Sequence, residues 1–79
     1  MNEKIKTLID IIMEAYNNTH HCVNNPYYYS FTMRYDGNGI DAGVDEIMEI
    51  YIKRNTPQDI YNQYDWYKSD GGRMFISVK

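Results

Sequence analysis

The sequence has few of the features that mark secreted or membrane proteins. Its single cysteine, Cys22, cannot form a disulfide within the chain, which excludes a secreted disulfide scaffold. The longest apolar run is much shorter than the roughly 20 residues that a membrane helix needs. Asp10 and Glu14 interrupt the N-terminal segment where a signal peptide would have a continuous apolar core. We therefore expect a cytoplasmic protein with no membrane contact.

Basic residues are also few. Eight Lys and Arg stand against eleven Asp and Glu, which gives a net charge of −3, and the basic residues are scattered along the chain. Direct binding of nucleic acid depends on a basic surface that neutralises phosphates, so we expect none. The length of 79 residues predicts a single domain, 1–79, whose small core would benefit from large aromatic side chains or a bound metal.

Helical periodicity appears in three segments. Residues 3–17 carry apolar side chains at i, i+3, i+4 and i+7, namely Ile5, Leu8, Ile9, Ile12, Met13 and Tyr16. Residues 44–52 repeat the pattern with Val44, Ile47, Met48, Tyr51 and Ile52. Thr56 and Pro57 have the chemistry of an N-cap and a first helical position. They predict a third helix with an inner face of Ile60, Tyr64 and Tyr67 that ends at Gly71 and Gly72.

Alternation with a period of two predicts strands over 27–35 and 74–78, the second with Met74, Ile76 and Val78 facing inward. The turn residues 36–39 between the first strand and Ile40 favour a short partner strand over 40–42. The expected fold class is α+β: a small sheet of two long strands, with a short third strand as an option, packed against about three helices. We expect the two long strands to pair.

The run Thr19-His20-His21-Cys22 gathers both histidines and the only cysteine directly after the first helix. Imidazole and thiolate are preferred zinc ligands, and three adjacent side chains converge only where the backbone is irregular. The sequence thus raises the hypothesis of a structural zinc bound by His20, His21 and Cys22, with a carboxylate such as Asp41 as the fourth ligand. Two alternatives remain open at this point: an ordinary polar loop, and a cysteine nucleophile with a histidine base.

An acidic stretch lies between Arg34 and Lys53, where Asp36, Asp41, Asp45, Glu46 and Glu49 occur without a basic residue among them. Such a stretch is either a solvated surface or a surface that engages a basic protein partner. Aromatic residues expected to point outward, Tyr61 and Trp66 in the third helix, would add contact area to the second interpretation. Phe75 is also expected to point away from the core.

The chain resembles the short, acidic, Asn- and Tyr-rich proteins of bacteriophages and mobile elements, and among these the anti-CRISPR inhibitors of Cas nucleases. The resemblance covers the whole chain in style, through Asn17-Asn18, Asn24-Asn25, Tyr27-Tyr28-Tyr29 and the acidic segment 36–49. It implies a stoichiometric inhibitor in the bacterial host cytoplasm that covers a nucleic-acid-binding surface of a Cas protein. It transfers no functional residue, because no shared motif is present.

Two other classes of function are compatible with the sequence. The first is an immunity or antitoxin-like protein with a different basic partner, and the second is a small zinc-dependent enzyme. The binding classes are favoured over catalysis, because no general base is evident beside the His20, His21 and Cys22 cluster. We therefore expect a binding protein that is not an enzyme and that exists as a monomer or homodimer.

The zinc hypothesis makes a direct prediction. Protein purified without chelator should carry about one equivalent of zinc per chain, bound through Cys22 and at least one of His20 and His21. Elemental analysis measures the metal content. Absence of zinc, together with a melting temperature that added zinc does not raise, would reduce the cluster to a polar loop.

Overall fold

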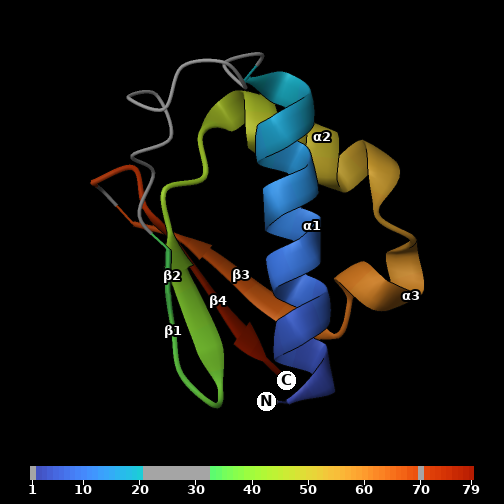
Figure 1. Cartoon of the computed structure of the whole chain (residues 1–79), viewed down its shortest axis with the longest axis vertical. Helices are drawn as coiled ribbons and strands as arrows, with labels where there is room; N and C mark the ends of the chain where they lie inside the picture. Colours follow the sequence, from blue (N-terminus) through green and yellow to red (C-terminus); the bar gives the residue numbers. More distant parts are fainter. Residues whose placement is uncertain (1, 21–32, 70) are drawn as a thin grey trace.

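A computed structural model of the chain describes residues 2–20, 33–69 and 71–79. It contains a long helix, a β-hairpin, two further helices and a second β-hairpin in chain order (Figure 1). The elements are α1 (Glu3–Thr19), β1 (Met33–Tyr35), β2 (Gly39–Ala42), α2 (Glu46–Asn55), α3 (Gln58–Tyr61), β3 (Tyr64–Lys68) and β4 (Met74–Val78). None of the helices in these ranges is long and apolar enough to cross a membrane.

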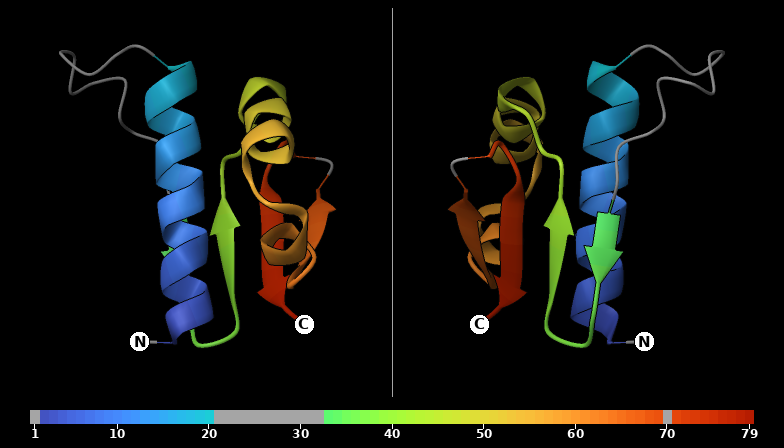
Figure 2. Two further views of the ribbon diagram at one scale, coloured as in Figure 1. Left: turned by 90° about the vertical axis from the view of Figure 1, so that its right-hand side faces the viewer. Right: turned by 90° about the vertical axis from the view of Figure 1, so that its left-hand side faces the viewer.

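The four strands form one antiparallel sheet in the order β1-β2-β4-β3. All helices lie on one face of this sheet, and the opposite face is left without a covering element among the described residues (Figure 2). The core lies between the layers, and its buried residues in the described ranges are all hydrophobic. The α+β prediction is confirmed, but the sheet has four strands, and β2 lies between β1 and β4. The expected direct pairing of the two long strands is therefore wrong.

Helix α1 forms as its periodicity predicts. Asn2 caps it by accepting a hydrogen bond from the Lys4 amide at 2.8 Å. Its buried face consists of Ile5, Leu8, Ile12, Ala15 and Tyr16. Ile9 is only partly buried at the margin of the core. The Tyr64 hydroxyl donates to the Lys4 carbonyl at 2.6 Å, which ties the start of α1 to β3.

Helix α2 begins at Glu46, two residues later than its apolar pattern suggests. Asp45 is its N-cap, and the Asp45 carboxylate accepts from the Met48 amide at 2.9 Å. Val44, Met48 and Ile52 are buried, but Ile47 is 60% exposed, so its predicted place on the inner face is wrong. Adjacent helical residues point about 100° apart, and burial of Met48 therefore turns Ile47 toward solvent.

The predicted third helix is mostly a strand. Helix α3 is a single turn, Thr56 is the C-cap of α2, and Tyr64–Lys68 form β3. Aromatic residues favour strands, and β3 pairs with β4 along its whole length. Gly72 takes φ +79° in the turn between them, a conformation that suits glycine. Local N-cap chemistry at Thr56 was thus overridden by pairing with β4.

Strand β4 has the predicted orientation, with Met74 and Ile76 buried and Phe75 and Ser77 exposed. Of the predicted strand 27–35, the segment 27–32 lies outside the described residues, and Met33–Tyr35 form β1. The predicted partner strand over 40–42 is confirmed as β2. Gly39 is required where β2 meets β4, because a Cβ there would lie 2.6 Å from the Ile76 carbonyl oxygen.

Replacing Leu8 with Ala tests the contact between α1 and the sheet. Leu8 is fully buried, so the substitution should lower the free energy of unfolding by about 2 to 5 kcal/mol. Ile47→Ala, at an exposed position of α2, is the matched control and should change it by less than about 0.5 kcal/mol. Chemical denaturation measures both values, and equal losses would show that the buried and exposed faces are misplaced.

Candidate functional site: the open face of the sheet

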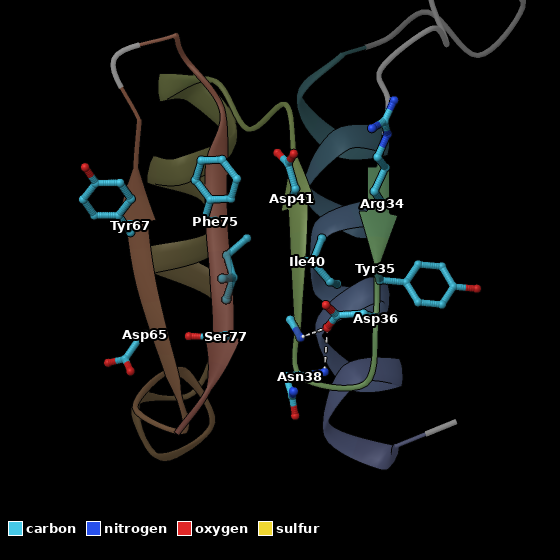
Figure 3. A pocket seen from close by; sticks show the side chains of 12 residues that line it. Arg34, Tyr35, Asp36, Asn38, Ile40, Asp41, Asp65, Tyr67, Phe75 and Ser77 are labelled. Carbon is cyan, nitrogen blue, oxygen red and sulfur yellow. Dashed lines mark hydrogen bonds between the residues drawn. The ribbon is translucent and has the colours of Figure 1, made fainter.

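The uncovered face of the sheet carries a row of four side chains, one from each strand. The strand register places Arg34, Asp41, Phe75 and Tyr67 side by side across β1, β2, β4 and β3. Asp65 and Ser77 form a second row with Gly39. These residues line an open pocket of about 460 Å³. Figure 3 shows the labelled side chains along the four strands. We call this surface the open face.

Tyr67 and Phe75 are the large apolar residues at one side of the open face. Their ring centroids lie 6.4 Å apart with the planes tilted by 35°. Tyr67 is 66% exposed and Phe75 is 44% exposed. Paired aromatic rings at this exposure gain contact area and release water when another surface covers them. The pair is therefore the strongest candidate for a contact with a partner.

Asp41 lies in the middle of the open face, where Arg73 neutralises it. Arg73 Nε is 2.6 Å from Asp41 Oδ1, and Arg73 Nη2 donates to the Asp41 carbonyl at 3.2 Å. Both side chains are about one-third exposed. The two-point contact gives the guanidinium a fixed orientation. Asp41 thus serves first to anchor the residue that precedes β4.

Asp36 shapes the turn between β1 and β2 at the lower end of the open face. Its Oδ1 accepts hydrogen bonds from the amides of Asn38 at 2.8 Å and Gly39 at 3.0 Å (Figure 3). These two bonds favour the ionised form and hold the pKa of Asp36 below its ordinary value of 3.8. The carboxylate therefore remains negative at neutral pH, and it is exposed.

Asp65 provides the second exposed carboxylate at the same end of the sheet, opposite Ser77. Its nearest ion-pair contact is Lys79 Nζ at 3.9 Å, and both side chains are more than half exposed. Pairs of this kind contribute little energy and dissociate readily in water. Asp36 and Asp65 are therefore accessible to a competing cation, unlike Asp41.

The other acidic residues singled out by the sequence lie on α2, in the helical layer. Asp45 caps α2 through Oδ1, and its other carboxylate oxygen, Oδ2, lies 2.6 Å from His20 Nε2. Glu49 contacts Lys53 at 3.2 Å and Lys68 at 3.7 Å. Among the described residues, Glu46 alone of these three carboxylates forms no ion pair. The acidic stretch is thus divided between two surfaces, and most of its members stabilise the fold.

Tyr61 and Trp66 do not point outward as predicted. Both are partly buried against the core, and their rings stack at 4.8 Å with planes 8° apart. Trp66 Nε1 donates to the Tyr61 carbonyl at 3.1 Å. The error follows from the missed strand: in β3, Trp66 faces the helices, and Tyr67, placed on an inner helical face by the sequence, faces solvent. Alternation over 64–68 was the signal that would have found it.

Of the four predicted zinc ligands, His21 and Cys22 lie outside the described residues. His20 is the C-cap of α1, contacts Asp45 and stacks on Tyr16 at 5.0 Å. Asp41 is held by Arg73 on the open face. Residues 2–20, 33–69 and 71–79 contain no group of three His, Cys, Asp or Glu side chains that could hold a metal ion. Zinc binding remains a prediction, and His20 already contacts a carboxylate other than the predicted Asp41.

No protein-family model, no curated protein and no solved structure matches the chain. We therefore infer the function from the open face itself.

The Asp36 turn predicts a specific acid dependence of stability. Folding lowers the pKa of Asp36, so the ionised carboxylate stabilises the folded state. This stabilisation is complete at pH values above 3.8 and is lost as the pH falls through the folded-state pKa. At pH 6, the Asp36→Asn variant should have a lower melting temperature than the wild type. This difference in melting temperature, the gap, should narrow below pH 4. Thermal unfolding between pH 6 and pH 2 measures the gap; a gap independent of pH would contradict the assigned cause.

Proposed function

We propose that the protein is a stoichiometric, non-catalytic inhibitor that binds another protein through the open face of its sheet. The observation that carries the proposal is the exposed Tyr67 and Phe75 pair on a face that no described element covers. Side chains of this size are usually buried in a small domain, so their exposure together favours a contact surface. Tyrosine and phenylalanine lose little conformational entropy when they are immobilised, which suits them to binding.

The chemistry of the open face favours a partner with a basic surface. Asp36 and Asp65 offer accessible negative charge at one end, and the faces of Tyr67 and Phe75 attract cations at the other. A lysine or arginine side chain of a partner would gain from both groups. Arg34 and Asp41, which Arg73 contacts, continue the row of Phe75 and Tyr67 across β2 and β1. Their charges would fix the orientation of the bound surface.

A Cas nuclease is the partner that we propose, because the chain resembles anti-CRISPR proteins in its acidic, aromatic and Asn-rich character. A nuclease must expose a basic surface to its nucleic acids, which an inhibitor with Asp36 and Asp65 can cover. An immunity or antitoxin-like role against another basic protein uses the same face and differs in the partner. A zinc-dependent enzyme would instead depend on His20, His21 and Cys22.

The proposal is tested by titrating the protein into DNA-cleavage reactions of a panel of purified Cas nucleases. The wild type should abolish cleavage near a 1:1 ratio for its target. The double variant Tyr67→Ser/Phe75→Ser should weaken inhibition at least about 10-fold, because truncating an aromatic hot spot typically costs about 2 kcal/mol or more.

Two control variants locate the effect on the surface. Ile47→Ser removes a 60% exposed apolar residue from α2, and Glu46→Lys reverses a charge there; both should inhibit like the wild type. Asp65→Lys should slow association, and the affinity of the wild type should fall as salt rises. If the open-face variants still inhibit and the α2 variants Ile47→Ser and Glu46→Lys do not, the assignment of the binding surface is overturned. Absence of inhibition and binding across the panel would refute a Cas target.

A further inference from the structure

Strand β3 forms one lateral edge of the sheet. Its neighbour on one side is β4, and within the described residues no strand lies on the other side (Figure 2). The strand spans five residues, Tyr64–Lys68, and contains neither proline nor a bulge in its pairing with β4. Regular edges of this length are templates for pairing with another strand unless they are shielded.

The hydrogen bonds around β3 show which of its backbone groups face outward. The Lys79 amide donates to the Gln63 carbonyl at 3.0 Å, and the Ser69 amide donates to the Arg73 carbonyl at 2.8 Å. In an antiparallel ladder, successive residues direct their backbone groups alternately toward the two sides. Residues 63, 65, 67 and 69 therefore bond to the β4 side. Tyr64, Trp66 and Lys68 direct their amides and carbonyls away from the sheet.

We propose that β3 pairs antiparallel with β3 of a second copy of this chain, with Tyr67 opposite Tyr67 on the two-fold axis. In this register, Trp66 of each copy lies opposite Lys68 of the other. These residues carry the outward backbone groups, so both pairs exchange hydrogen bonds. The result is a continuous eight-stranded sheet with all helices on one side. This inference does not depend on the proposed function.

The distribution of charge favours a second copy in this register. Asp65 lies opposite Ser69 of the other copy, so the two Asp65 carboxylates are four residues, or about 13 Å, apart along the strand direction. Lys68 faces the helices, where Glu49 lies 3.7 Å away and compensates its positive charge. A shift that set Asp65 against Asp65 would place like charges directly opposite, which is unfavourable.

The aromatic side chains also favour self-pairing. Tyr67 is the most exposed large apolar residue in the described part of the chain, and it lies on the edge strand itself. Pairing at Tyr67 would join Phe75, Tyr67 and the same two residues of the second copy into one aromatic stripe across the joined open faces. Tyr67 occupies a non-hydrogen-bonded position of the new ladder, where opposed side chains approach closely.

A charge-exchange experiment tests the pairing. Wild-type protein should sediment at twice the chain mass of 9.4 kDa at high concentration. Tyr67→Lys and Tyr67→Glu should each sediment as monomers, because each sets like charges against each other on the axis. An equimolar mixture of the two should regain dimers at least about 10-fold more tightly than either variant alone. Circular dichroism should show that both variants fold, since Tyr67 is mostly exposed.

The matched control uses Phe75→Lys and Phe75→Glu, which lie one strand further from the axis on the same face. Each Phe75 variant should dimerise alone, and an equimolar mixture of the two should not dimerise more tightly. In a Cys22→Ser background, Tyr67→Cys should form a disulfide-linked dimer on mild oxidation and Asp65→Cys should not. Three results would each overturn the proposal. They are a wild type that is monomeric at about 1 mM, an equimolar mixture of Tyr67→Lys and Tyr67→Glu that stays monomeric, and disulfide formation by Asp65→Cys instead of Tyr67→Cys.

Discussion

The structure depends on burying one face of a four-stranded sheet under a single layer of helices. Leu8 and Ile12 of α1 and Met48 and Ile52 of α2 pack in one apolar cluster with the inner residues of β2 and β4. A chain of 79 residues has no further element among its described parts to cover the second face. One side of the sheet therefore becomes the core, and the other side becomes available for contacts.

This division explains how the charged residues are used. Carboxylates in the helical layer, such as Asp45 and Glu49, cap α2 or contact nearby cations, and so they stabilise the arrangement of helices on the sheet. Carboxylates at the lower end of the open face, Asp36 and Asp65, are exposed and engage their own chain only weakly or through the backbone. Exposed aromatic area and available charge thus occur together on the open face.

The sequence predicts the elements whose periodicity is long or unmixed, and α1 and β4 are accordingly confirmed. It fails at residues 64–68, because the N-cap chemistry of Thr56 and Pro57 is local, whereas the strand forms through pairing with β4. That single error reverses the expected orientations of Trp66 and Tyr67. As a result, the sequence does not predict that Tyr67 is exposed beside Phe75. The ion pairs of Asp41 and Asp45 involve Arg73 and His20, which are distant in sequence, so no local pattern reveals them.

The most direct test of a sheet that is covered on one side only is hydroxyl-radical footprinting read by mass spectrometry. Phe75 and Tyr64 are rings of similar size on adjacent strands, but Phe75 lies on the open face and Tyr64 is 2% exposed beneath the helices. The account predicts rapid labelling of Phe75 and protection of Tyr64 in the native protein, with both labelled after denaturation. Equal protection of the two rings in the native protein would contradict it, because both faces of the sheet would then be covered.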